Sequence, residues 1–439
     1  MKILIIGNGA REHALTWAIS QNPRCTKIYC SPGNAGTTEL ATNVDIDVTS
    51  NNEILEMCLL HSIDLVIVGP EKQFEQGLTN ALKEKNILVF GPTMEASQLE
   101  ASKSFTKNMC KHKKIPTGNY EIFSRVDDAK KFLREQPTPY VIKADGLAAG
   151  KGVLVSSDIE EADNFISSIF AGKIGTVKTK VIIEEYLEGK EMSVFFAIDK
   201  KTIKYIGSAQ DYKRAFDHDR GPNTGGMGAF SPSPLLTKKI LEKILNKIIK
   251  PTVEYMKETG NEFSGILYAG LVLNNGEPKL IEYNVRFGDP ECQALCVRLG
   301  AQIFDIYFSG AKNELSRLSI NEACDSAITV IVAEKGYPKN PRSDCELNDI
   351  VDIKYNKALK IFHAGTYFKN NFLCNTGGRI FSFTVRSKNL KDARTIVYKA
   401  LTILVSALYT IVLASLRFLL LTVKLKIRPP VLYKKLFLK

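Results

Sequence analysis

Polar and apolar residues alternate in the segment IEYNVRFGDPECQ, residues 281–293. Alternate side chains of an extended chain share a face, so Glu282, Asn284 and Arg286 are predicted to line one side of a strand. A carboxylate and an amide oxygen suit Mg²⁺, which fills its remaining positions with phosphate oxygens and water. Arg286 could bind a phosphoryl group or a substrate carboxylate in bidentate fashion. A solvated edge strand is the alternative for Glu-x-Asn alone, but the longer run with RFGDPE favours a binding site.

A second segment, IKADGLAAGKGV, combines three glycines with two lysines. The glycines predict a flexible loop between two strands whose backbone N–H groups can face phosphates, and the lysines add positive charge. The spacing differs from a Walker A loop, because a glycine follows the second lysine where Ser or Thr is required. A plain hairpin loop is the alternative. The residues concerned are Lys143, Gly146, Gly150, Lys151 and Gly152.

The segment GNGAREH, residues 7–13, follows the first apolar run. It does not complete a dinucleotide-binding fingerprint, because Glu12 stands where the third glycine should allow close packing. The N-terminus of a helix still attracts anions, so a substrate that carries a phosphate is expected here.

The segment GPNTGGMGAFSPSP, residues 221–234, is too rich in glycine for a regular element. Gly225, Gly226 and Gly228 indicate backbone that lies close against a small ligand, with a long surface loop as the alternative.

Several classes of function are excluded by what the sequence lacks. No His/Cys spacing supports a zinc site, and no catalytic serine or cysteine signature is present. His363, in FHAGT, is expected to be a packed or hydrogen-bonded core residue. The last 42 residues hold eight basic residues and no acid, so the rest carries only about +4 of the net +12. Since no basic stripe interleaved with aromatic residues occurs there, a nucleic-acid partner is not expected.

The first hundred residues alternate short apolar runs with amphipathic stretches, which predicts a parallel sheet with crossover helices. The predicted strands are 2–7, 27–33, 63–70 and 87–92, and two of the amphipathic stretches are 12–20 and 74–85. Ligands of such sheets lie beyond the carboxyl ends of the strands, which here carry GNGAREH, SPGNAGT and GPE.

From about Glu100 the sequence pattern changes. The expected elements are a helix over 101–112, a strand–loop–strand unit over 140–155, two strands over 180–199, a turn-rich segment over 208–234, a helix over 235–258, a hairpin around Asn275-Gly276, and a third unit that begins with 326–334.

Motifs from residue 1 to about residue 395 occur together in a known order. They are GNGAREHA, SPGNAGT, VGPE, IKADGLAAGKGV, EEYLEGKE, QDYKR, GPNTGGMGAFSP, YAGL, IEYNVRFGDPE and FHAGT. In sequence and order they resemble the phosphoribosylamine–glycine ligase family (glycinamide ribonucleotide synthetases) of the ATP-grasp superfamily. The resemblance implies an α/β and α+β multidomain protein. Its parts would be an N-terminal parallel α/β domain (1–102), an ATP-grasp region with a mobile lid (103–322, lid about 123–190), a smaller C-terminal α+β domain (323–398) and an atypical tail (399–439).

The same resemblance implies a reaction in which ATP, glycine and 5-phosphoribosylamine give glycinamide ribonucleotide, ADP and phosphate through glycyl phosphate. This is a step of purine biosynthesis. The implied cofactor is Mg²⁺ or Mn²⁺, held by Glu282 and Asn284. A cytoplasmic monomer is expected, and the scattered cysteines without CxxC pairs also fit a reducing compartment.

Site residues follow from the matched motifs. For catalysis the resemblance implies Arg286, Lys143, Asp211 and Lys213. For ATP it implies Lys103, Lys143, Gly146, Gly150, Lys151, Gly152, Glu184, Glu185, Tyr186, Leu187 and Glu191. For the amino-acid and amine substrates it implies Gly9, Arg11, Glu12, Glu71, Arg214, Asn223, Thr224, Gly225, Gly226, Gly228, Asp289 and Pro290.

The chain departs from the family pattern mildly at Ala10 and at NTGGR (375–379), and strongly at its end. Residues 400–423 contain a single charge, Arg417, and are long enough to span a bilayer. The favoured interpretation is a tail that has lost the family's sequence, for example through a shifted reading frame. A membrane anchor is the alternative, which the cost of an arginine in lipid disfavours.

Overall fold

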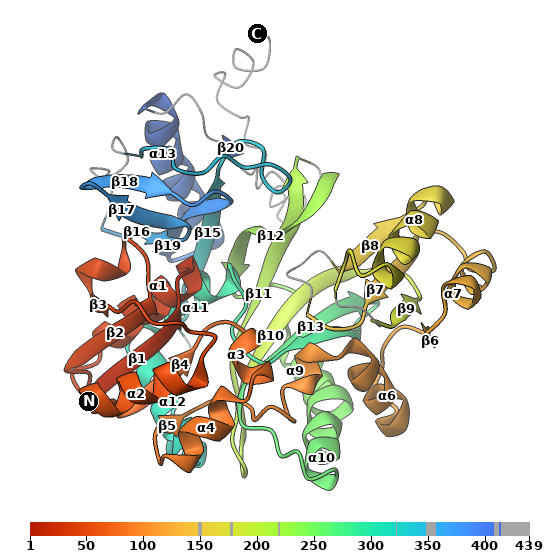
Figure 1. Cartoon of the computed structure of the whole chain (residues 1–439), viewed down its shortest axis with the longest axis horizontal. Helices are drawn as coiled ribbons and strands as arrows, with labels where there is room; N and C mark the ends of the chain where they lie inside the picture. Colours follow the sequence, from red (N-terminus) through yellow and green to blue (C-terminus); the bar gives the residue numbers. More distant parts are fainter. Residues whose placement is uncertain are drawn as a thin grey trace.

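The first hundred residues form a parallel sheet in the strand order β3-β2-β1-β4-β5, which confirms the predicted architecture (Figure 1). Its strands are β1 (Lys2–Gly7), β2 (Lys27–Pro32), β3 (Thr42–Asn43), β4 (Leu65–Val68) and β5 (Leu88–Val89). Its helices are α1 (Ala10–Ser20), α2 (Asn51–His61), α3 (Lys72–Glu75) and α4 (Leu78–Glu84). The predicted helix over 74–85 is divided at Gly77, which has a positive φ of 78°.

These and the following bounds come from a computed structural model, which describes residues 1–147, 152–175, 179–217, 220–321, 323–347, 357–407 and 412–413.

Residues 120–184 form a small antiparallel sheet in the order β6-β9-β7-β8, with two helices packed on it. We call this segment the β6–β9 unit; it lies apart from the N-terminal sheet on the right of Figure 1. Its elements are β6 (Tyr120–Phe123), α7 (Val126–Leu133), β7 (Tyr140–Ala144), β8 (Val153–Ser156), α8 (Ile159–Phe170) and β9 (Val181–Glu184). The strand–loop–strand prediction for 140–155 is confirmed by the pairing of β7 with β8.

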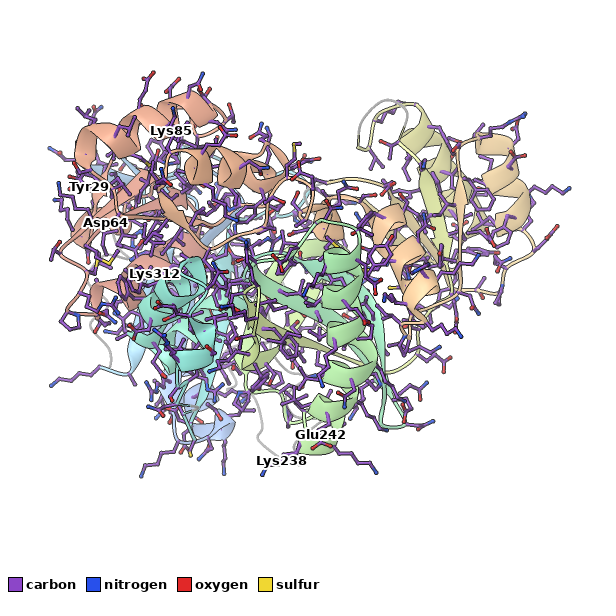
Figure 2. All side chains as sticks on the ribbon, turned by 90° about the horizontal axis from the view of Figure 1, so that it is seen from below. Tyr29, Asp64, Lys85, Lys238, Glu242 and Lys312 are labelled. Atoms are coloured by element: carbon purple, nitrogen blue, oxygen red, sulfur yellow. The ribbon has the colours of Figure 1, made fainter. Side chains whose placement is uncertain are left out.

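A long antiparallel sheet runs through the middle of the molecule in the order β14-β13-β10-β11-β12-β15-β19-β16. Its central strands are β10 (Lys190–Ile198), β11 (Ile203–Phe216), β12 (Arg220–Ser231), β13 (Gly265–Asn274) and β14 (Glu277–Asn284). The predicted hairpin around Asn275-Gly276 is confirmed by β13 and β14. Helices lie beside this sheet, and Figure 2 shows from below the one that carries Lys238 and Glu242. The helices of this region are α5 (Gln98–Ala101), α6 (Lys103–Lys113), α9 (Lys238–Ile244) and α10 (Lys250–Glu258), with a π-helical turn at Leu245–Ile249.

The prediction of an irregular segment over 208–234 is wrong, because β11 and β12 are long paired strands. Their pairing shifts register on both sides of Arg214. Gly226, with a φ of 105°, accommodates the irregular backbone that a side chain would resist. Glycine-rich sequence therefore marks a distorted strand here.

The C-terminal residues extend the same sheet, because β15 pairs with β12 on one side and β19 on the other. The elements are α11 (Glu291–Leu299), α12 (Gln302–Ala311), β15 (Ser326–Ala333), β16 (Leu359–His363), β17 (Thr366–Lys369), β18 (Phe372–Asn375), β19 (Arg379–Ser387), α13 (Leu390–Ala407) and β20 (Val412–Leu413). No helix among the described residues combines the length and apolarity needed to cross a membrane. Residues 400–423, for which a membrane anchor was the alternative interpretation, lie largely outside those residues.

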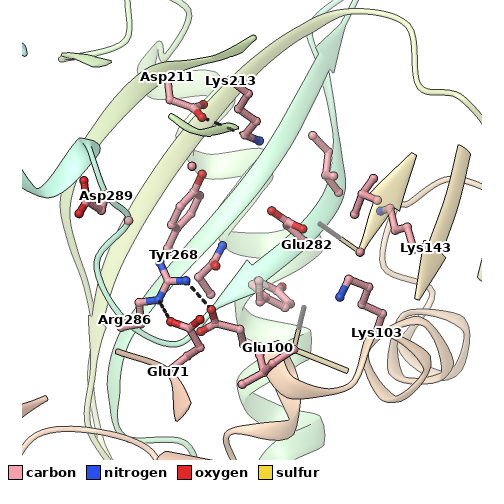
Figure 3. A pocket seen from close by; sticks show the side chains of 18 of the residues that line it. Glu71, Glu100, Lys103, Lys143, Asp211, Lys213, Tyr268, Glu282, Arg286 and Asp289 are labelled. Carbon is pink, nitrogen blue, oxygen red and sulfur yellow. Dashed lines mark hydrogen bonds and ion pairs between the residues drawn. The ribbon is translucent and has the colours of Figure 1, made fainter. Parts of the chain in front are cut away.

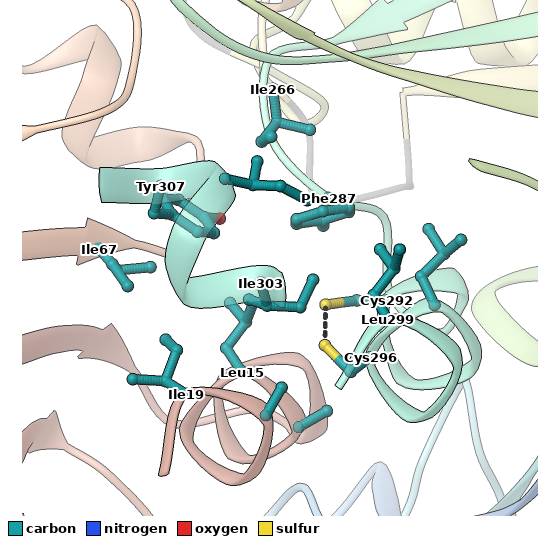
Figure 4. Packing of buried hydrophobic residues seen from close by; sticks show 14 of the residues in the cluster. Leu15, Ile19, Ile67, Ile266, Phe287, Cys292, Cys296, Leu299, Ile303 and Tyr307 are labelled. Atoms are coloured by element: carbon teal, nitrogen blue, oxygen red, sulfur yellow. Dashed lines mark hydrogen bonds between the residues drawn. The ribbon is translucent and has the colours of Figure 1, made fainter. Parts of the chain in front are cut away.

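One hydrophobic cluster joins the N-terminal sheet to the central sheet. Leu15 and Ile19 of α1 pack with Ile303 and Tyr307 of α12, and the cluster includes Phe287 (Figure 4). Because these side chains are buried, α1 and the segment after β14 are held at a fixed distance. The loop before α1 therefore faces the end of β14, where the predicted metal ligands lie.

Candidate active site

The predicted site residues gather around a cavity of about 390 Å³ between the N-terminal sheet, the central sheet and the β6–β9 unit. Those that line it are Arg11, Glu71, Lys103, Lys143, Gly152, Glu184, Asp211, Lys213, Thr224, Gly225, Glu282, Asn284, Arg286 and Asp289. Those outside its lining are Gly9, Glu12, Gly146, Glu185, Tyr186, Leu187, Glu191, Arg214, Asn223, Gly226, Gly228 and Pro290. Gly150 and Lys151 lie outside the described residues.

Strand β14 presents Glu282 and Asn284 to this cavity. Burial opposes ionisation of Glu282, but the nearby Lys213, Lys143 and Lys103 outweigh it, so the pKa of the carboxyl lies below its usual range. The strict alternation predicted for this strand is interrupted, because a register shift opposite Gly270-Leu271 brings Ile281 to the cavity as well. The strand thus offers an ionised carboxylate and an amide, with an apolar neighbour.

Three lysines surround the other side of the cavity. Lys143 lies 2.9 Å and Lys107 lies 3.0 Å from the same oxygen, Oε2 of Glu184. Lys103 donates a hydrogen bond of 2.9 Å to the carbonyl of Gly146. Burial lowers the pKa of Lys103 and of Lys107, although Glu282 and Glu184 respectively oppose the shift. This buried positive charge suits a polyphosphate.

Glu184 holds two of these lysines and keeps one oxygen available. Burial opposes its ionisation, yet Lys143 and Lys107 together lower its pKa. Its Oε1 atom is buried and has no hydrogen-bond partner within the described part of the chain. The two next residues point elsewhere, since Glu185 bonds to the backbone of Asn119 and Tyr186 is 46% exposed.

Arg286 is held by two carboxylates at the edge of the cavity (Figure 3). Its Nη2 donates to Oε1 of Glu100 at 2.7 Å, and its Nε lies 3.2 Å from Oε2 of Glu71. The other oxygen of Glu100 accepts from the backbone N–H of Val285 at 2.8 Å. Burial raises the pKa of Glu100 to about 7 against the effect of Arg286. Glu100 was not predicted, because no local pattern distinguishes it.

A further group of acids lies beside the predicted Asp211 and Lys213. The Tyr268 hydroxyl donates to Oε1 of Glu291 at 2.9 Å, and the Ser193 hydroxyl donates to the Tyr268 oxygen at 2.8 Å. Burial and the nearby Asp211 raise the pKa of Glu291 to about 7. Tyr268 and Glu291 also escaped prediction, although Glu291 belongs to the RFGDPE motif.

The glycine-rich part of β12 is fixed by residues of the C-terminal part. Nη1 of Arg379 donates to the carbonyl of Gly225 at 2.7 Å and lies 3.2 Å from Oδ1 of Asp289. The Tyr337 hydroxyl accepts a hydrogen bond from the N–H of Gly225. Arg214 instead bonds to the carbonyl of Gly221 and so holds the hairpin itself. Arg379 was not among the predicted site residues, because no local pattern connects it with this site.

The loop before α1 approaches the same region from the N-terminal sheet. Glu12 accepts from the N–H of Gly9 and from Nε of Arg11, both at 2.7 Å. Nη1 of Arg11 reaches across to the carbonyl of Phe287 at 3.1 Å. Glu12 therefore fixes the loop, and Arg11 connects it to the end of β14.

His363 is a hydrogen-bonded residue between the N- and C-terminal parts, as predicted. Its backbone N–H donates to Nδ1 of His13 at 2.9 Å, and its ring bonds to the hydroxyl of Thr366.

The chain is similar in sequence to known proteins along most of its length. Sequence models of the phosphoribosylglycinamide synthetase N domain, ATP-grasp (A) domain and C domain match residues 1–100, 101–292 and 327–408. A phosphoribosylamine–glycine ligase of Rhizobium meliloti is 44% identical over 400 residues, which cover 91% of this chain and 94% of that protein. The chloroplastic phosphoribosylamine–glycine ligase of Arabidopsis thaliana is 43% identical over 398 residues, covering 89% and 75% of the two chains.

Solved structures have a similar fold. The crystal structure of phosphoribosylamine–glycine ligase from Thermotoga maritima has a TM-score of 0.80 at 30% identity and covers 94% of this chain and 97% of that one. A biotin carboxylase domain from Hydrogenobacter thermophilus has a TM-score of 0.68 at 17% identity over 94% of this chain and 90% of that one, which is a likeness of fold alone. The predicted family is thereby confirmed: with its parallel N-terminal sheet, its lysine-lined cavity and its C-terminal extension, the chain belongs to the phosphoribosylglycinamide synthetase family of ATP-grasp proteins.

Proposed function

We propose that this chain ligates glycine to 5-phosphoribosylamine at the expense of ATP, in the purine biosynthetic pathway. The products are glycinamide ribonucleotide, ADP and phosphate. The observation that carries the proposal is a single cavity in which Glu282 and Asn284 face Lys103 and Lys143, while the loops of the N-terminal sheet and of β12 close the other side. The nucleotide and the acceptor would thus bind at opposite sides of one cavity.

A divalent cation fits the residues of β14. Glu282 is ionised, because the surrounding lysines outweigh its burial, and Asn284 adds a neutral oxygen ligand. Within the described residues no cluster of three His, Cys, Asp or Glu side chains forms an all-protein metal site. This donor set suits Mg²⁺ or Mn²⁺, whose remaining ligands are phosphate oxygens and water. When bound, such a cation neutralises phosphate charge and orients the γ-phosphoryl group.

The nucleotide occupies the side of the cavity next to the β6–β9 unit. Lys103 and Lys143 contact the phosphates, and Gly146 and Gly152 lie next to them. The backbone of residues 184–187 lies along the adenine, while the side chains of Glu185 and Tyr186 point away from the cavity, and Glu191 binds the ribose hydroxyls. The buried ion pairs of Glu184 support this placement, because they position Lys143 before any ligand arrives.

The reaction has two steps. A carboxylate oxygen of glycine attacks the γ-phosphorus of ATP, the bond to the bridging oxygen breaks, and ADP leaves. The amine nitrogen of phosphoribosylamine then attacks the carbonyl carbon of glycyl phosphate, phosphate leaves, and the amine loses a proton. Arg286 contacts the transferring phosphoryl group or the glycine carboxylate, and Asp211 and Lys213 border the reacting centre. Most of the catalytic effect comes from positioning and charge neutralisation.

The acceptor lies between the N-terminal loops and β12. The residues proposed for it are Gly9, Arg11, Glu12, Glu71, Arg214, Asn223, Thr224, Gly225, Gly226, Gly228, Asp289 and Pro290. The contacts of Arg11 with Phe287 and of Arg379 with Asp289 support this placement, because they join the N-terminal loop and the C-terminal part to the same segment after β14.

Phosphate release from ATP tests the proposal. We expect release only when glycine and phosphoribosylamine are both present, and a variant Glu282→Ala that is nearly inactive. Glu277→Ala is the matched control, because this exposed acid lies on the same strand and bonds to Lys243 and Lys247 instead of lining the cavity. Equal release without the amine, or with a different amine in its place, would contradict this substrate pair.

We propose that the chain is divided as expected from the sequence. The N-terminal domain spans 1–102, the ATP-grasp region 103–322 with its lid at about 123–190, the C-terminal domain 323–398 and the tail 399–439. We also propose a cytoplasmic monomer, which size-exclusion chromatography of the full chain would test.

A further inference from the structure

Glu100 is an acidic residue that lines the cavity but takes no part in the reaction steps proposed above. It belongs to the short helix α5, directly before the helix that carries Lys103. Its side chain is 7% exposed and borders the cavity next to Arg286 (Figure 3). A carboxylate so deeply buried needs partners that stabilise its charge.

Both carboxylate oxygens of Glu100 accept hydrogen bonds, and both donors belong to the segment directly after β14. Oε1 accepts from Nη2 of Arg286 at 2.7 Å, and Oε2 accepts from the N–H of Val285 at 2.8 Å. Val285 directly follows Asn284. One carboxylate therefore fixes the guanidinium of Arg286 and the backbone immediately after the proposed metal ligand.

The remaining contacts of Arg286 leave it dependent on this bond. Glu71 lies 3.2 Å from Nε, but the geometry there is that of an ion pair without a hydrogen bond. Nη1 donates to the carbonyl of Phe287 at 3.2 Å, close to its own backbone. Arginine has many rotamers, so a short charge-assisted bond to Nη2 contributes strongly to its orientation.

We propose that Glu100 is a positioning residue of the ligase reaction, which holds Arg286 and the end of β14 in the geometry that phosphoryl transfer requires. The inference rests on the proposed function. Glu100 acts through Arg286 and Val285 and has no direct contact with the reacting atoms. Loss of its bridge should therefore lower the rate of the chemical step and leave nucleotide binding almost unchanged.

The first test compares Glu100→Gln and Glu100→Asp with wild type. Glutamine has one acceptor oxygen and an NH₂ group, so it cannot accept both hydrogen bonds, and aspartate keeps the charge but is one methylene shorter. We expect kcat to fall about 100-fold for Glu100→Gln, the effect of a displacement of about 1 Å, and about 10-fold for Glu100→Asp. The KM and the calorimetric Kd for ATP should change less than about twofold. The exposed acid Glu84, changed to glutamine, is the matched control and should retain wild-type values.

A double-mutant cycle with Arg286→Lys then tests whether Glu100 acts through Arg286. If it does, Glu100→Gln should lower kcat much less in the Arg286→Lys background than in wild type. Fully additive effects, or a Glu100→Gln enzyme with wild-type kcat, would overturn the inference. Thermal unfolding checks folding. Should Glu100→Gln fail to fold, Glu100→Asp decides, because a folded Glu100→Asp enzyme with wild-type kcat equally overturns it.

These outcomes are separate from those of the proposed function. If wild type releases no phosphate in the presence of glycine and phosphoribosylamine, the proposed function fails. If wild type is active and Glu100→Gln is equally active, only the role of Glu100 fails.

Discussion

Substitution of Gly226 by alanine tests how β12 is seated against the segment after β14. The residue has a φ of 105°, which L side chains rarely adopt. A Cβ atom there would lie 2.4 Å from Cδ of Pro290 and 3.3 Å from the carbonyl oxygen of Asp289. The ring of Pro290 cannot rotate away, so the strand itself would have to move.

The expected loss of stability has two parts. The unfavourable backbone conformation costs about 1–2 kcal/mol for a residue with a Cβ. Overpacking against Pro290 adds about 1–3 kcal/mol. Gly226→Ala should therefore lower the free energy of unfolding by about 2–5 kcal/mol. Gly276→Ala separates the two parts, because Gly276 also has a positive φ of 77° but no atom within 4 Å of the added Cβ.

Urea unfolding followed by circular dichroism measures both variants. Gly276→Ala should lose about 1–2 kcal/mol and keep full activity, since it lies in the turn of the β13–β14 hairpin. Gly226→Ala should lose more and should lower kcat/KM for phosphoribosylamine about 10-fold or more, because the contact between β12 and Asp289 would shift. Equal stability and equal activity of the two variants would refute the proposed seating of β12.

Three further outcomes are expected. Glu282→Gln should lower kcat on the order of 100-fold, as for the loss of one charge-stabilising group, and raise the Mg²⁺ concentration for half-maximal phosphate release; an unchanged Mg²⁺ titration would contradict the metal assignment. Arg379→Gln loses its bond to Gly225 and should raise KM for phosphoribosylamine about 10-fold or more while KM for ATP stays constant; steady-state kinetics check this. Burial lowers the pKa of His13 to about 3 and of His363 to about 4. Both imidazoles are neutral in the folded chain, whereas in the unfolded chain their pKa is about 6.5. The free energy of unfolding should therefore be highest above pH 6.5. As the pH falls from there towards 4, it should decrease by up to about 1.4 kcal/mol per pH unit for each histidine. Urea unfolding at pH 7 and 5 measures this loss, and His13→Asn, whose side-chain oxygen can replace Nδ1 as acceptor, should halve it.

Local sequence patterns were sufficient for the parts of the fold that are locally determined. The apolar runs of β1 and β4 and their crossover helices indicate a parallel sheet without any long-range information. The same holds for β13 and β14, because Asn275-Gly276 specifies the turn that pairs them. The alternation of Glu282 and Asn284 likewise placed the proposed metal ligands on the cavity.

Long-range contacts could not be read in this way. Glu100 meets Arg286, Lys107 meets Glu184, and each pair is brought together only by the packing of distant elements. The sequence around Glu100 and around Lys107 does not distinguish either residue from an ordinary surface residue. Arg379 is a similar case, because its partner Gly225 lies 154 residues earlier in the chain.

The glycine-rich strand was misread for a different reason. High glycine content lowers strand propensity, so residues 221–234 were predicted to be irregular. Tertiary pairing with β11 and β15 overrides that preference, and the glycines permit close contact with Asp289-Pro290. The low strand propensity of these glycines is real, but it does not include the pairing with neighbouring strands that decides the structure here.

The central proposal is that the carboxylate of glycine is activated by the γ-phosphoryl group before the amine attacks. Glycine labelled with ¹⁸O in both carboxylate oxygens tests this directly, when it is incubated with the enzyme, ATP, Mg²⁺ and phosphoribosylamine. Activation through glycyl phosphate predicts one ¹⁸O atom in each phosphate released, visible as an isotope shift in the ³¹P spectrum. Phosphate that carries no label, formed together with glycinamide ribonucleotide, would contradict it.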